Sequence, residues 1–202
     1  MCITLVKMKK HKQIFSLLII ILLILVSALL VFSFRNVGRW LIISDAVPSR
    51  LDVVFTFAGE NVRVSYSKEL MSRFDDARWI LSDYKDGHSR LLRKSNYDMS
   101  KVLVIDSCKN TYSEVNALMD QLRSCDKELY VGLVSGPYHM RRIKMMLSRQ
   151  ERIPNVNFVF LPVPLERYNW TDSMIRRWWK SGSVSSAVVS EIQKIVYFML
   201  FS

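Results

Sequence analysis

The sequence predicts an α/β protein, a Rossmann-like three-layer sandwich with a mostly parallel sheet of about five strands, preceded by one N-terminal transmembrane helix. Two observations carry this prediction. Five short segments are apolar almost throughout and alternate with segments of helical spacing, the pattern of parallel strands covered on both faces. Ahead of them, residues 14–34 carry no charged side chain.

The apolar segment at residues 14–34 reaches roughly 30 Å at about 1.5 Å per residue, the thickness of a hydrocarbon core. Four lysines precede it and two arginines follow it, which orients the N-terminus toward the cytoplasm. The run is long and lacks a small-residue exit, so we expect an uncut anchor, with a cleaved signal peptide as the alternative. The expected location is the cytoplasmic membrane, crossed once, with the C-terminal domain in the periplasm or on the extracellular side.

The chain therefore divides into four predicted parts: a basic cytoplasmic tail (1–13), the anchor (14–34), a linker (35–50) and an α/β domain (51–202). Strands are predicted at residues 51–57, 77–82, 101–106, 129–135 and 156–163. Helices are predicted at residues 63–74, 110–124, 137–149 and 186–201. Residues 83–100 are polar and are expected to be irregular.

The formal net charge of +11 is divided between two sources. Residues 1–50 hold seven Lys/Arg and one Asp, so topology accounts for about half of the excess. The remainder suits anionic lipid or an anionic ligand. Nucleic acid is not expected as a partner, because no run alternates basic and aromatic residues.

Several common sites are disfavoured by the sequence. It contains no GxGxxG, no Walker lysine loop and no GxSxG elbow. No Cys/His spacing indicates a metal, and no cofactor is indicated. A helix of about 15 residues between Cys108 and Cys125 would hold them about 20 Å apart, so we expect separate buried thiols.

Distinctive residues follow three of the predicted strands, and the ends of parallel strands share one edge. Gly59 and Gly136 allow close backbone approach and positive φ. Arg63 and Arg142 are candidate anion clamps. The remaining candidates are His139 as acid, base or donor, Glu114 as base or orienting group, and Asn110, Thr111 and Tyr138 as ligand-binding residues.

Several of these residues could also have a purely structural role. Asn110 and Thr111 are ordinary helix caps in many proteins, and His139 taken alone fits a structural histidine. Arg141 is expected to be a solvated surface charge, and Trp178-Trp179 fit packing better than a membrane-interface patch. The convergence of three strand ends favours a site.

Four segments resemble the YdcF/SanA/ElyC-like family of bacterial envelope proteins. They are "FAGENVRVSYSKEL" (57–70), "DSCKNTYSEVNAL" (106–118), "VGLVSGPYHMRRIKMML" (131–147) and "SEIQKIVYFML" (190–200). The Tyr138-His139-Met140-x-Arg142 turn is the most specific of these similarities. Gly59, Arg63, Asn110, Thr111, Glu114, His139 and Arg142 fall on motif positions of the family.

The resemblance implies a Rossmann-like domain with a role in envelope biogenesis or barrier function, acting on an anionic or phosphorylated small molecule or a lipid-linked precursor. The chain departs from the family where the second strand ends in Ser82-Asp83-Tyr84 rather than Ser-Gly-Gly. Two alternatives therefore stay open: a non-catalytic binding or regulatory module with a degenerate site, and a cytosolic methyltransferase-like domain that uses a nucleoside cofactor.

Overall fold

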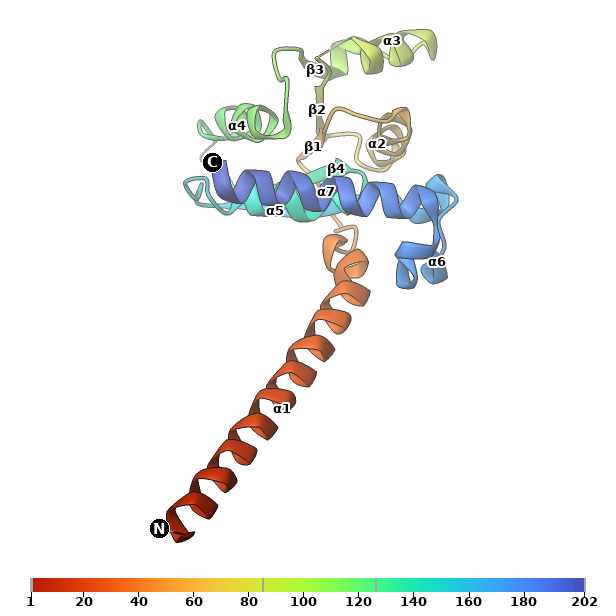
Figure 1. Ribbon diagram of the computed structural model, residues 1–202. Coiled ribbons are helices and arrows are strands. Elements are labelled where there is room, and N and C mark those ends of the chain that lie inside the picture. The colour runs from red at the N-terminus through yellow and green to blue at the C-terminus, as the bar shows by residue number, and fades with distance from the viewer. Residues whose placement is uncertain (1, 85, 126, 202) are drawn as a thin grey trace. The chain divides into compact units, whose positions relative to one another are not determined.

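The computed structural model describes residues 2–84, 86–125 and 127–201 (Figure 1). The chain divides into two compact units, Met1–Val37 and Gly38–Ser202. Helix α1 (Cys2–Leu41) makes up the first unit and contributes its last turn to the second. Its segment Leu17–Leu41 contains an 18-residue window with a mean hydropathy of 3.3 and is long and apolar enough to cross a membrane. The predicted apolar helix is thus present, and it continues into the segment predicted as linker.

The second unit is built on a five-stranded sheet with the order β3-β2-β1-β4-β5. All neighbouring strands are parallel, so the predicted α/β fold class is confirmed. The strands are β1 (Val53–Thr56), β2 (Arg78–Ser82), β3 (Val102–Ile105), β4 (Leu129–Ser135) and β5 (Val156–Pro162).

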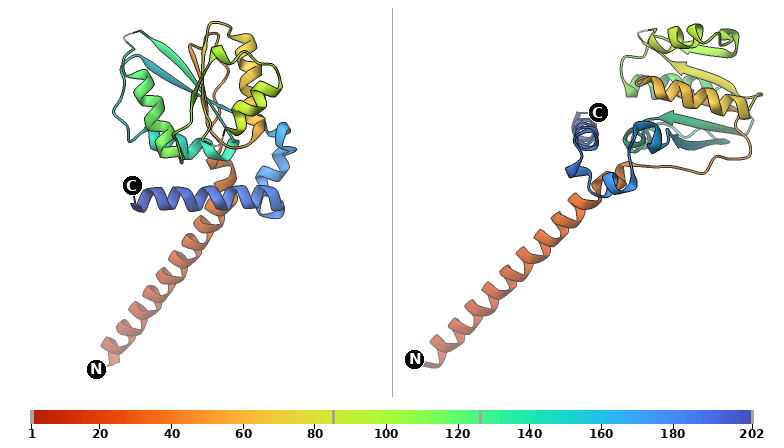
Figure 2. Two further views of the ribbon diagram at one scale, coloured as in Figure 1. Left: turned by 90° about the horizontal axis from the view of Figure 1, so that it is seen from above. Right: turned by 90° about the vertical axis from the view of Figure 1, so that its right-hand side faces the viewer.

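Helices cover both faces of this sheet (Figure 2). Val54 of the central strand packs under α2 (Asn61–Arg73) and α3 (Gly87–Lys94), whereas the next residue, Phe55, packs under α4 (Thr111–Leu122) and α5 (Met140–Leu147). Successive side chains of a strand point to opposite faces, so a central strand covered on both sides is buried at every position and is mostly apolar. This is why the predicted strands read as continuous apolar runs.

Helix α7 (Gly182–Phe201) closes the chain and buries one face, formed by Val184, Val188, Glu191, Ile195 and Phe198. By length and composition it is also a candidate membrane span, with a mean hydropathy of 1.4 over an 18-residue window. Short elements precede it: η3 (Leu165–Tyr168), α6 (Asp172–Arg176) and η4 (Trp178–Lys180). Two further 3-10 turns are η1 (Met99–Lys101) and η2 (Pro137–His139), the latter leading directly into α5.

The prediction of an irregular segment at residues 83–100 was wrong, because α3 lies within it. The helix has only eight residues, and its first turn is capped by a residue outside it. Asp83 accepts hydrogen bonds from the backbone N–H groups of His88 and Ser89 in the first turn. Such tertiary capping leaves little trace in local hydrophobic periodicity.

Arg141, predicted as a solvated surface charge, also makes packing contacts. It is half-buried, and its Nε donates to the carbonyl oxygen of Trp40 at 2.8 Å. Its guanidinium also lies 4.7 Å from the centre of the Trp40 ring. Partial burial lowers the pKa of Arg141, so this surface cation also packs against Trp40.

The cysteines and the tryptophan pair follow the sequence expectation in part. Cys108 is buried, Cys125 is half-buried, and both are free thiols. Trp178 is buried and its ring meets that of Trp179 edge to face, which agrees with a packing role, although Trp179 is only half-buried.

Candidate functional site

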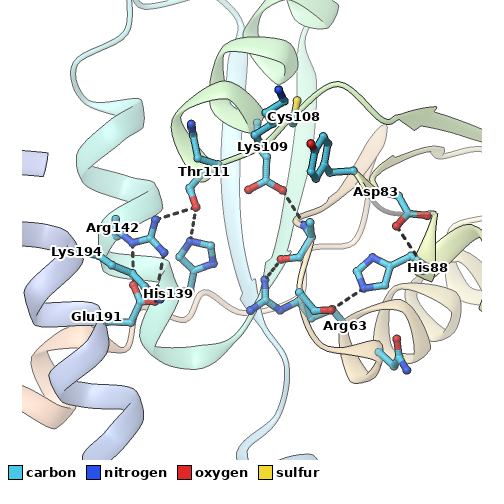
Figure 3. A pocket seen from close by; sticks show the side chains of 17 residues that line it. Arg63, Asp83, His88, Cys108, Lys109, Thr111, His139, Arg142, Glu191 and Lys194 are labelled. Atoms are coloured by element: carbon cyan, nitrogen blue, oxygen red, sulfur yellow. Dashed lines mark hydrogen bonds and ion pairs between the residues drawn. The ribbon is translucent and has the colours of Figure 1, made fainter. Parts of the chain in front are cut away.

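The candidate site lies where the strand order reverses. The chain runs from β1 outward through β2 and β3, and then returns to the other side of β1 to form β4 and β5. Ligands of open parallel sheets bind beyond the strand ends at such a switch point. A cavity of about 500 Å³ is present there, lined by residues that follow β1, β2, β3 and β4 and by two residues of α7 (Figure 3).

Most of the predicted site residues line this one cavity. They are Gly59, Arg63, Asn110, Thr111, Glu114, His139 and Arg142. Gly136 and Tyr138 instead line a neighbouring cavity of about 350 Å³, which shares Arg63 and His139 with the first. The Tyr138 side chain is buried and packs against the Trp170 ring, with 5.3 Å between ring centres.

The two glycines differ in what they provide. Gly59 has a φ of +145°, and a Cβ atom there would lie 2.6 Å from Cζ of Arg63. The backbone conformation therefore favours glycine here, and a larger residue would also displace the Arg63 guanidinium from its place. Gly136 has a φ of −64°, which any residue adopts, so the freedom for positive φ that glycine offers is not used there.

Arg63 is buried on the first turn of α2, beside the end of β1. Its Nε donates to Oε2 of Glu60 at 2.9 Å, and its Nη1 donates to the carbonyl oxygen of Ala58. The guanidinium is thereby fixed against the loop after β1 and presented to the cavity.

Helix α4 begins at the rim of the cavity with a reciprocal cap. The Asn110 side chain accepts from the backbone N–H of Ser113, and the Ser113 hydroxyl accepts from the backbone N–H of Asn110. The predicted capping role of Asn110 is therefore confirmed. One turn later, Oε1 of Glu114 accepts from the backbone N–H of Ala58 at 2.7 Å.

Glu114 is buried, and burial raises the pKa of its carboxyl group above the usual range. The hydrogen bond from Ala58 and the charges of Arg63 and Arg142 oppose this shift without overcoming it. This environment therefore favours the protonated form of the Glu114 carboxyl group more than water does.

His139 is buried at the end of η2 and contacts two hydroxyl groups. Its Nδ1 lies 2.6 Å from Oγ of Ser135, and its Nε2 lies 3.0 Å from Oγ1 of Thr111. Burial, together with the charges of Arg142, Arg63 and Lys194, lowers the pKa of His139 well below 6.5. The imidazole is consequently neutral at pH 7, with one donor and one acceptor nitrogen.

Arg142 joins three elements around the same point. Its Nε donates to Oε2 of Glu191 at 2.8 Å and its Nη2 donates to Oε1 at 3.2 Å, a two-pronged ion pair with α7. Its Nη1 donates to Oγ1 of Thr111 at 2.7 Å. Lys194, one turn further along α7, donates to Oε1 of Glu191 at 2.9 Å (Figure 3).

Glu191 and Lys194 were not among the predicted site residues, although the sequence contains a signal for one of them. Glu191 occupies a position in the buried stripe of α7, whose other members are apolar. A carboxylate in an apolar stripe indicates a buried partner of opposite charge. That partner, Arg142, is 49 residues away and could not be identified from the pattern.

Asp83 and His88 also line the cavity without having been predicted. Burial raises the pKa of Asp83, but hydrogen bonds from the Ser89 hydroxyl and from the Ser89 and His88 backbones outweigh it, and the pKa is lowered. The Asp83 carboxylate is thus occupied in capping α3. The Nε2 of His88 donates to the carbonyl oxygen of Gly59 at 2.9 Å, which ties α3 to the loop after β1.

The arrangement can hold an anion and move protons. Cationic groups come from α2, the β3–α4 loop, α5 and α7, and a neutral imidazole and a buried carboxyl group line the same space. Within the described ranges 2–84, 86–125 and 127–201, no three His, Cys, Asp or Glu side chains are grouped so as to hold a metal ion. Comparison with protein-family models gave no match to this chain, and a search of curated proteins found no similar sequence.

Proposed function

We propose that this is a membrane-anchored protein of bacterial envelope biogenesis or barrier function, which binds an anionic, phosphorylated precursor in the cavity at the switch point. The observation that carries the proposal is the convergence of Arg63, Lys109, Arg142 and Lys194 on one polar cavity. Phosphate oxygens are bound by such groups. The start of α4, where backbone N–H groups lie at a helix N-terminus, adds a favourable dipole. The resemblance to the YdcF/SanA/ElyC-like family is consistent with this role.

The charge balance of the cavity supports an anionic ligand. Three carboxyl groups line the cavity with the four cations, Asp83, Glu114 and Glu191, and Glu60, outside the lining, pairs with Arg63. Because burial raises the pKa of Glu114, this group offsets the positive charge less than an exposed glutamate would. The Lys109 ammonium lies 5.8 Å from the centre of the Tyr84 ring, at the mouth of the cavity.

If the protein is an enzyme, the reaction proposed is hydrolysis or transfer of the bound ligand. Two titratable groups in one cavity whose pKa values are displaced in opposite senses mark candidate acid and base assignments. His139, with its lowered pKa, is the candidate base, and Glu114, with its raised pKa, is the candidate proton donor.

Inorganic phosphate is the first probe of the binding site. We expect the full chain in detergent to bind phosphate in isothermal titration calorimetry. We expect the Arg63→Gln variant to bind about 10- to 150-fold more weakly, because a hydrogen bond to a charged group contributes about 1.5–3 kcal/mol. Arg123→Gln is the matched control, since Arg123 is exposed and pairs with Asp120 on α4. Equal affinity of wild type and Arg63→Gln, or no binding at all, would contradict the proposed site.

A non-catalytic binding or regulatory module is the second candidate function. One observation favours it: both cavity arginines already have carboxylate partners, Glu60 for Arg63 and Glu191 for Arg142. On this candidate, a strain lacking the protein is complemented by the combined Glu114→Ala and His139→Ala variant but not by a chain without its anchor. Failure of the combined variant, when it is stably produced, would favour the catalytic form.

The proposed topology has the N-terminus in the cytoplasm and the domain on the far side of the membrane. Alkaline phosphatase folds only outside the bacterial cytoplasm, where its disulfides form. We therefore expect phosphatase activity when alkaline phosphatase is fused to the C-terminal end of the chain. We expect no phosphatase activity when it is fused to the N-terminal tail that precedes residue 14. The opposite result would place the domain in the cytoplasm and would favour the nucleoside-cofactor alternative.

A further inference from the structure

Thr111 has an unusual setting for a hydroxyl group at the start of a helix. Its side chain is buried, yet it lines both the polar cavity and an adjoining apolar groove between α4 and α7. The preceding residue, Asn110, already caps the helix, so Thr111 is not needed for that purpose. Its hydroxyl instead faces away from its own helix, toward α5 and η2.

The hydrogen bonds of this hydroxyl leave it one reactive lone pair. A threonine hydroxyl has one proton and two lone pairs. Nη1 of Arg142 donates to one lone pair at 2.7 Å. The proton is directed to Nε2 of His139 at 3.0 Å when that nitrogen is unprotonated. The second lone pair then remains for a bond to an incoming atom.

His139 is held in the orientation that this arrangement needs. With Nε2 unprotonated, the ring proton is on Nδ1, which donates to Oγ of Ser135 at 2.6 Å. The ring of Phe57 packs edge to face against the imidazole, with 5.8 Å between centres. A hydroxyl within reach of a base, with the base oriented by a third group, is the signature of an activated nucleophile.

The surroundings of the Thr111 hydroxyl also stabilise the negative charge that its oxygen gains as it loses the proton. The Arg142 guanidinium contacts the oxygen directly, and Thr111 is the first residue of α4, a helix of 12 residues. Positive charge and a helix N-terminus both stabilise negative charge at that oxygen. Arg142 itself is fixed by its ion pair with Glu191, so the contact costs little reorganisation.

We propose that Thr111 is the nucleophile of a phosphoryl-transfer reaction on a phosphate ester, with His139 as its base and Ser135 as the group that positions His139. This inference rests on the proposed function, because the phosphorylated ligand must occupy the cavity. Thr111 would carry the phosphoryl group as a covalent intermediate.

The reaction balances with water and a phosphate monoester as its only reactants. Oγ1 of Thr111 bonds to phosphorus as the ester P–O bond breaks, its proton passes to Nε2 of His139, and Glu114 protonates the departing alcohol oxygen. Water then bonds to phosphorus as the Oγ1–P bond breaks. The water proton restores Glu114, and His139 returns its proton to Oγ1, which leaves the alcohol and inorganic phosphate.

The test uses the full chain in detergent and p-nitrophenyl phosphate as the probe. The reaction is quenched in acid, the intact mass is measured, and peptide mapping locates any phosphoryl group. We expect one added phosphoryl group on residue 111 in the wild type and in Thr111→Ser, and none in Thr111→Val. In His139→Gln we expect release of p-nitrophenol to fall about 10²–10⁴-fold, the usual contribution of general base catalysis.

Thr171→Val is the matched control, because Thr171 is also a threonine at a helix start, where it accepts from the backbone N–H of Met174. It lies outside the cavity lining and should leave the adduct unchanged. Wild-type protein that binds inorganic phosphate but forms no adduct, or carries the adduct at another residue, would overturn the role of Thr111 and leave the proposed function intact. Wild-type protein that binds no phosphate would overturn the proposed function itself.

Discussion

The Glu191→Ala variant is expected to lose about 3–5 kcal/mol of unfolding free energy, because it leaves the buried guanidinium of Arg142 without a carboxylate to balance its charge. The two side chains are only 10% and 11% exposed and are joined at 2.8 Å. Denaturant unfolding of the full chain in detergent, followed by far-UV circular dichroism, measures the loss.

Two controls separate this effect from a general loss of charge. Asp120→Ala removes one partner of an exposed pair, Asp120–Arg123, and should change the unfolding free energy by no more than about 1 kcal/mol. The double variant Glu191→Leu with Arg142→Met removes both buried charges and should recover most of the stability, since apolar replacement of a buried pair is often neutral. If Glu191→Ala unfolds at the same denaturant concentration as wild type, the ion pair does not stabilise the contact.

Acidification below pH 6.5 is expected to destabilise the protein through His139, by up to about 1.4 kcal/mol for each pH unit. The pKa of His139 is lowered well below 6.5 in the folded chain by burial and by the charges of Arg142, Arg63 and Lys194. Between its folded and unfolded pKa values the unfolded chain binds the extra proton, so unfolding becomes more favourable as the pH falls.

The His139→Gln variant isolates this contribution, because it removes the titrating ring. We expect wild type to lose more unfolding free energy than His139→Gln as the pH is lowered from 7 to 5. Glu114 acts in the opposite sense: its pKa is raised, so its contribution to stability is lost as the pH rises above 4.5. Parallel pH profiles of wild type and His139→Gln would show that His139 is not held neutral by the fold.

The strands and most helices could be predicted because their cause is local. Val54 and Phe55 face opposite helix layers, so a central strand has no polar face, and the apolar run is visible in the sequence itself. The capping pair Asn110 and Ser113 likewise lies within four residues, so the start of α4 is indicated by the local sequence. Helix α3 was missed because its cap, Asp83, lies outside it and acts through the fold.

The sequence by itself determined the fold class, the apolar N-terminal helix and the residues that meet beyond the strand ends, because parallel strands necessarily bring their carboxyl ends to one edge. Only the tertiary structure decided how those residues are paired. In the folded chain, Arg142 contacts both Glu191 of the last helix and Thr111, and Thr111 contacts His139. These contacts join positions 28 to 49 residues apart. Hydrogen-bond partners are set by the packing of whole helices, and a one-dimensional pattern of residue types does not contain that information.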